Sequence, residues 1–139
     1  DVTIQGQVLR LLQRLRAERG LALILVTHDF GVVATMADRV AVMYAGAVVE
    51  YADAVELFHA PRHPYTEALL NANPRRVLDA AGQGAKLEPI PGTPPNPFDL
   101  FPGCSFAPRC PKRYDACSLV PVLAACQPGH DAACWLAHS

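Results

Sequence analysis

The segment LALILVTHD, residues 21–29, is the strongest indication of how this 139-residue chain folds. Its first six residues are apolar, and such an uninterrupted run is typical of a strand buried on both faces of a parallel sheet. We therefore predict a buried strand over residues 22–27. The run ends in Thr27, His28 and Asp29, which carry hydrogen-bonding or charged groups. Ligands of α/β sheets bind at the carboxyl ends of strands, so His28 either contacts a phosphate or a water, or merely caps the strand.

The segments on both sides of this run complete an α/β pattern. Before it, apolar residues recur at three- and four-residue spacing, as in an amphipathic helix lying on a sheet, and Gly20 ends the pattern. After it, residues 30–37 are expected to form a short helix. Residues 40–44 and 47–50 are apolar runs separated by Ala45-Gly46, which predicts a β-hairpin. This order of helices and strands assigns the chain to the α/β class.

The same residues resemble the end of the ATP-binding domain of ABC transporters, which is a P-loop NTPase fold. The resemblance is carried by DVTIQ at residues 1–5, by the Thr-His-Asp strand end, and by DRVAVMYAGAVVE at residues 38–50. It implies that Asp1 is the last residue of the D-loop. It also implies that His28 is the switch histidine, which contacts the γ-phosphate of ATP and the attacking water. Both residues would lie at a nucleotide interface that holds ATP and Mg²⁺.

The motifs that bind most of the nucleotide do not occur in this sequence. No Gly-x-x-x-x-Gly-Lys-Ser/Thr loop is found, and the first residues already match the D-loop. We therefore interpret the chain as the C-terminal part of a longer ATPase, without its Walker A, Walker B and signature motifs. The full-length subunit would be an ATPase, and the fragment alone is expected to be inactive.

The middle of the chain carries a second, more specific resemblance. Residues 54–72 contain LFHAPRHPYTEALL, which predicts a short helix to His59 and a new helix that starts at Pro64. Residues 73–101 are rich in proline and glycine, which predicts an irregular arm that includes Ile90-Pro91-Gly92. Both motifs are similar to the C-terminal extension of oligopeptide/dipeptide importer ATPases.

Cysteines are confined to the last segment, residues 102–139. All five lie within the final 36 residues, and with no export signal this favours a metal site over a disulfide framework. Five residues separate Cys104 from Cys110, and six separate Cys110 from Cys117. These spacings are wide for a zinc knuckle and compatible with a larger iron–sulfur cluster, so spacing leaves both open.

The resemblance adds a ligand set. GCSFAPRC at residues 103–110 and GHDAACWL at residues 129–136 are very similar to the end of the peptide-importer ATPases. It implies a [4Fe–4S] cluster, with zinc as the alternative, held by Cys104, Cys110, Cys117 and Cys134. Cys126 is interpreted as a bystander, although it could replace Cys134 or form a disulfide.

We thus predict four segments: the C-terminal part of an ABC ATPase domain (1–53), a helical connector (54–72), a proline-rich arm (73–101) and a four-cysteine module (102–139). The implied function is the ATP-binding subunit of a peptide importer, peripheral on the cytoplasmic face of the membrane. Its partners would be a second ATPase subunit, transmembrane permease subunits and, indirectly, an extracytoplasmic solute-binding protein. The formal charge of −1 and the lack of a basic stripe argue against a nucleic-acid partner. The alternative is a stand-alone metal-binding or redox module on an α/β scaffold.

Overall fold

The computed structural model describes residues 2–72, 89–96 and 99–138. They group into two units, residues 1–37 and residues 38–139, which we describe separately. Asp1 lies outside the described residues, and so does most of the predicted arm over residues 73–101. The four segments predicted from the sequence stay a prediction. Among the described helices, none is both long enough and apolar enough to cross a membrane.

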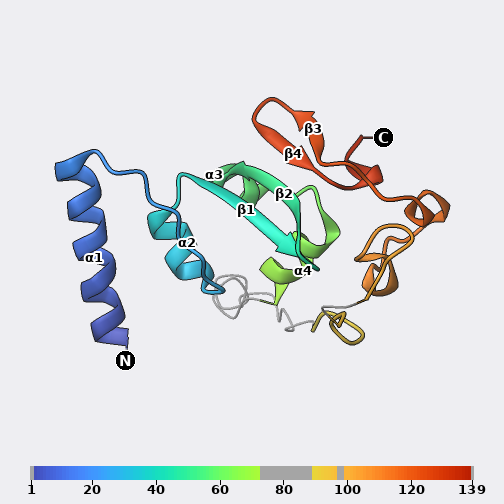
Figure 1. The fold of residues 1–139 in the computed structure, drawn as a ribbon, viewed down its shortest axis with the longest axis horizontal. Coiled ribbons are helices and arrows are strands. Elements are labelled where there is room, and N and C mark those ends of the chain that lie inside the picture. The colour runs from blue at the N-terminus through green and yellow to red at the C-terminus, as the bar shows by residue number, and fades with distance from the viewer. Residues whose placement is uncertain (1, 73–88, 97–98, 139) are drawn as a thin grey trace, which may run out of the picture. The chain divides into compact units, whose positions relative to one another are not determined.

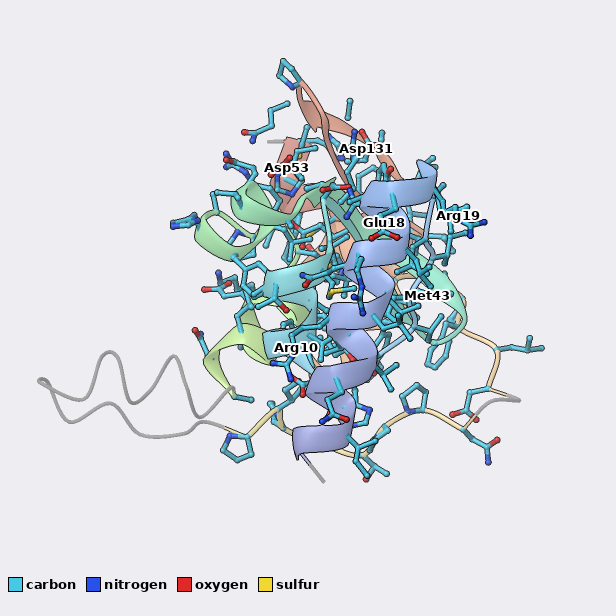
Figure 2. The ribbon with its side chains drawn as sticks, turned by 90° about the vertical axis from the view of Figure 1, so that its left-hand side faces the viewer. Arg10, Glu18, Arg19, Met43, Asp53 and Asp131 are labelled. Carbon is cyan, nitrogen blue, oxygen red and sulfur yellow. The ribbon has the colours of Figure 1, made fainter. Side chains whose placement is uncertain are left out.

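The first unit contains two helices, α1 (Val2–Arg19) and α2 (Phe30–Met36). Gly20 ends α1 with a positive φ of 61°, and the Leu21 N–H donates to the Arg16 carbonyl at 3.3 Å, as in a Schellman C-cap. The predicted glycine stop is thus confirmed. Figure 2 shows the charged side chains of Arg10, Glu18 and Arg19 projecting from α1, and all three are exposed.

The predicted buried strand over residues 22–27 is wrong for this structure. Residues 21–27 form no regular element, and the side chains of Ile24 and Val26 are 93% and 94% exposed. A parallel strand needs hydrogen-bonded neighbours, and none of the described strands pairs with this segment. The apolar face of α1 is exposed for the same reason, since the first unit contains no sheet among its described residues.

The second unit is built on one antiparallel sheet of four strands in the order β1-β2-β4-β3 (Figure 1). The strands are β1 (Arg39–Tyr44), β2 (Ala47–Asp53), β3 (Ala124–Gln127) and β4 (His130–Ala132). Ala45 and Gly46 both have positive φ, as a two-residue type I′ turn requires, so the predicted hairpin is confirmed. The described sheet is antiparallel, whereas the sequence predicted a parallel one. The described fold is a small α/β fold.

The helical connector follows β2 directly. It consists of α3 (Ala54–His59) and α4 (Pro64–Asn71), as the sequence predicted. Asp53 caps α3 by accepting from the Val55 N–H at 3.0 Å. His63 caps α4 through Nδ1, which accepts from the Tyr65 N–H at 3.0 Å. The described residues of this unit also form three short 3₁₀ helices, at Ala107–Arg109, Asp115–Ser118 and Trp135–His138.

The core of this unit joins the hairpin to the cysteine segment. Its buried members are Val42, Tyr44, Val49, Ala52, Leu57 and Phe106. The Phe106 ring lies edge-on to Tyr44, with centroids 5.2 Å apart, and 5.3 Å from Tyr65. One aromatic residue between the first two cysteines therefore anchors the cysteine segment on the hairpin.

Candidate functional site

His28 directly precedes Asp29, the N-cap residue of α2, and is exposed. Its neighbours are fixed by local hydrogen bonds. The Asp29 carboxylate accepts from the backbone N–H groups of Gly31 and Val32 at 2.8 and 3.3 Å, which caps α2. The Asp29 N–H donates to the Thr27 hydroxyl at 3.0 Å. The backbone around His28 is thus held on both sides, while its imidazole faces solvent and is available to a ligand.

The two residues predicted to contact the nucleotide are Asp1 and His28. Their proximity is not tested, because Asp1 lies outside the described residues. Asp29 acts as a helix cap, so its carboxylate is occupied by backbone donors. This leaves His28 as the one predicted nucleotide contact that can be placed within the described part of the chain.

The four predicted metal ligands line one small cavity of about 10 Å³, which is close to the volume of a single water. The cavity wall also includes Phe106, Trp135 and His63. The four cysteines, at positions 104, 110, 117 and 134, thus line the same cavity, although 29 residues separate the first from the last.

Backbone geometry explains how the first and third cysteines meet. The Cys104 N–H donates to the Cys117 carbonyl at 3.0 Å. This approach requires glycine at position 103, because a Cβ there would lie 2.5 Å from the Cys117 carbonyl oxygen. The glycine of the Gly-Cys motif is therefore explained by a close backbone crossing.

The surroundings of three thiols in this cavity disfavour the charged thiolate form. Burial raises the pKa of Cys104, Cys110 and Cys134 above the ordinary value. Backbone N–H donors partly oppose this, such as Phe106 and Ala107 at Cys104, while the charge of neighbouring thiolates raises these pKa values further. Without a cation, the cavity therefore favours neutral thiols.

The residues present do not form a metal site as they are placed. Over residues 2–72, 89–96 and 99–138, no group of three or more His, Cys, Asp or Glu side chains is arranged to hold one ion. The thiol donors and the N–H groups around them suit a metal chemically, but their spacing does not. Neither the [4Fe–4S] cluster nor zinc is supported, and the alternative function as a metal-binding module gains no support.

A buried polar network lies beside this cavity and was missed from the sequence. Glu50 of β2 and His130 of β4 are 0% and 1% exposed, and their Oε1 and Nε2 atoms are 2.7 Å apart. The sequence analysis assigned no role to Glu50, since alternation along residues 47–50 places it on the face opposite Val49. No local pattern connects two residues that are 80 positions apart.

The proline-rich motif at residues 90–92 is fixed by Arg109. Its Nε donates to the Pro91 carbonyl at 2.8 Å, and Nη2 donates to the Ile90 carbonyl at 3.4 Å. Arg109 follows the Phe106 anchor by one 3₁₀ turn, so the cysteine segment holds this end of the arm. Lys112 adds an exposed ion pair with Glu67 of α4.

Comparisons with known proteins identify several relatives of the chain. The chain is similar to the probable peptide ABC transporter ATP-binding protein y4tR of Sinorhizobium fredii, with 49% identity over 97% of the chain and 40% of the relative. The oligopeptide transport ATP-binding protein OppD of Salmonella typhimurium is 48% identical, over 97% of the chain and 39% of the relative. The dipeptide transport ATP-binding protein DppD of Bacillus subtilis is 47% identical, over 98% and 40%. The chain spans about 40% of the length of these curated relatives.

The class of protein follows from these findings: the chain is homologous to ATP-binding proteins of peptide ABC transporters. More particularly, residues 49–117 match the family described as the oligopeptide/dipeptide transporter, C-terminal region, and the chain belongs to this family. The resemblance inferred from the sequence is therefore confirmed.

Proposed function

We propose that this chain is the C-terminal part of an ATP-binding subunit of an ABC-type peptide importer. It contributes His28 to a nucleotide site whose phosphate-binding motifs lie elsewhere in the subunit. The observation that carries the proposal is the exposed His28 at the end of an apolar segment, with both neighbouring residues committed to local hydrogen bonds. The relatives are ATP-binding proteins for peptide transport by name, which supports the same function.

The proposed role of His28 is to bind the γ-phosphate and to orient the attacking water. ATP and Mg²⁺ supply the phosphoanhydride bond and the charge that neutralises its oxygens. The chain supplies a side chain that can donate a hydrogen bond from one ring nitrogen and accept one at the other. The Asp29 cap fixes the start of α2 and with it the backbone next to His28.

The proposed partners are a second ATPase subunit, which completes the nucleotide site, and transmembrane permease subunits. A solute-binding protein on the opposite face would deliver the peptide. The subunit itself would be peripheral on the cytoplasmic face of the membrane. Co-purification of the intact subunit with its permease subunits from detergent-solubilised membranes tests this part of the proposal. Recovery of the subunit without them would contradict it.

The test of the nucleotide role is His28→Ala in the intact subunit, assembled with its permease partners. Loss of a residue that handles the attacking water should reduce ATP turnover by a factor on the order of 100 or more, with ATP binding retained. His59→Ala is the matched control, because His59 is exposed on α3 and bonds only to the Val55 carbonyl of its own helix. Unchanged turnover in His28→Ala would remove His28 from the mechanism.

A further inference from the structure

Glu50 is a fully buried carboxylate that accepts three hydrogen bonds. The donors are the Arg62 N–H at 2.6 Å, the His63 N–H at 3.1 Å and His130 Nε2 at 2.7 Å. A buried charge is costly unless its oxygens are all engaged, and here two backbone donors and one ring donor engage them. Glu50 therefore binds two segments to β2: the entry to α4 and the β3–β4 hairpin.

A β-bulge puts Glu50 on the buried face. Val42 of β1 is opposite Glu50, while Met43 is opposite Val48, so Val49 is the extra residue. Without the bulge, Val49 would face Val42, and Glu50 would face the exposed side of the sheet. Such a bulge re-aims one side chain, and the side chain it re-aims here is the carboxylate.

The network also fixes the proton on His130. The Gln127 carbonyl oxygen accepts from Arg62 at 2.7 Å, so its amide nitrogen faces Glu56 at 2.7 Å and His130 Nδ1 at 3.5 Å. The carboxylate of Glu50 can only accept, so His130 Nε2 is the donor of the 2.7 Å hydrogen bond between them. Three donors thus point at Glu50, which requires a side chain that only accepts.

This network reaches the cysteine cavity through His63 and, along the chain, through the residues that follow His130. His63, which donates to Glu50, lines the cavity, and its Nδ1 caps α4. On the other side, Ala133 follows β4 and donates to the Val49 carbonyl at 2.8 Å, and Cys134 comes next. The four residues from His130 to Ala133 are therefore held on β2 at both ends, and Cys134 follows directly.

We infer that Glu50 and His130 are a positioning pair that fixes Cys134 in the cysteine cavity and couples the cavity to the β1–β2 hairpin. When the pair is intact, the Cys134 thiol is kept half-buried against the other three. When it is broken, β4 and Cys134 separate from β2, and the thiol gains solvent. This inference does not depend on the nucleotide role of His28.

The experiment measures the alkylation rate of each cysteine by N-ethylmaleimide in the intact subunit, resolved by peptide mass spectrometry. Glu50→Gln keeps the shape but places an amide nitrogen against a donor. Loss of a charge-assisted hydrogen bond should accelerate alkylation of Cys134 by a factor on the order of ten, with Cys110 much less affected. Exposure also removes the burial that raises the Cys134 pKa, which acts in the same direction.

Two further variants make the result specific. His130→Gln can still donate to Glu50 and should leave Cys134 slow, whereas His130→Ala should accelerate it like Glu50→Gln. Glu67→Gln is the control, because Glu67 makes only an exposed ion pair with Lys112, which lines the same cavity. An unchanged Cys134 rate in Glu50→Gln, or equal acceleration of all five cysteines, would overturn the inference.

Discussion

Replacement of Phe106 by alanine should destabilise the second unit strongly. The Phe106 side chain is 1% exposed and packs edge-on against Tyr44 and tilted against Tyr65. Truncation of a buried phenylalanine typically costs about 3–5 kcal/mol, of which two aromatic contacts account for about 1–2 kcal/mol. We therefore expect a loss of about 4 kcal/mol, a large share of the roughly 5–15 kcal/mol that holds a domain folded.

Urea denaturation of the chain, followed by circular dichroism, measures this loss. With a slope of about 2 kcal/mol per molar, the unfolding midpoint should fall by about 2 M. Leu100→Ala is the control, because Leu100 is 96% exposed and should change the midpoint by little. A loss below about 1 kcal/mol for Phe106→Ala would refute the reasoning, since it would mean that the cysteine segment is not anchored by this ring.

Three further predictions concern single features. Gly103→Ala should destabilise the chain by about 2 kcal/mol or more in the same urea assay, since its Cβ would meet the Cys117 carbonyl at 2.5 Å. In the control Gly6→Ala in α1, the Cβ meets nothing within 4 Å, and the change should stabilise by about 0.5–1 kcal/mol. Equal effects of the two substitutions would contradict the backbone crossing. Burial lowers the pKa of His63 to about 4, so the folded state binds fewer protons than the unfolded state, and the free energy of unfolding should fall by about 3 kcal/mol as pH drops from about 6.5 to 4. His63→Asn should lose less, because the asparagine side-chain oxygen can still cap α4. A urea midpoint that does not change with pH would contradict the buried neutral ring. The sequence resemblance predicts about four iron and four sulfide per chain after anaerobic purification, and an absence of both would agree with the cysteine placement described above and refute the cluster.

Local patterns were sufficient where local chemistry decides the structure. The β1–β2 hairpin follows from two apolar runs around Ala45-Gly46, whose positive φ angles match the turn. The two helices of the connector follow from a proline at the first position of α4 and from His63 as its cap. In each case the residues that stabilise the element lie within a few positions of one another.

The sequence failed where partners far along the chain decide. The segment at residues 21–27 has the composition of a buried strand, but a strand is defined by neighbours, and the described residues provide none. The proximity of the four cysteines was inferred from the family resemblance. Their arrangement around the cavity, which is not that of a metal site, depends on how the chain packs around Phe106 and Trp135. The burial of Glu50 was not predicted, because a bulge at Val49 shifts the alternation of buried and exposed residues along the strand.

The strand β2 links the hairpin to the segments that follow it. The family match begins at residue 49, inside β2, rather than after the hairpin, where the sequence placed a boundary at residue 53. β2 pairs with β1 on one side, and Glu50 and Tyr51 pair with β4 on the other. Glu50 also holds the entry to α4 through the Arg62 and His63 N–H groups. Residues on both sides of position 53 therefore contact one another through β2, so a boundary drawn at residue 53 would cut through these contacts.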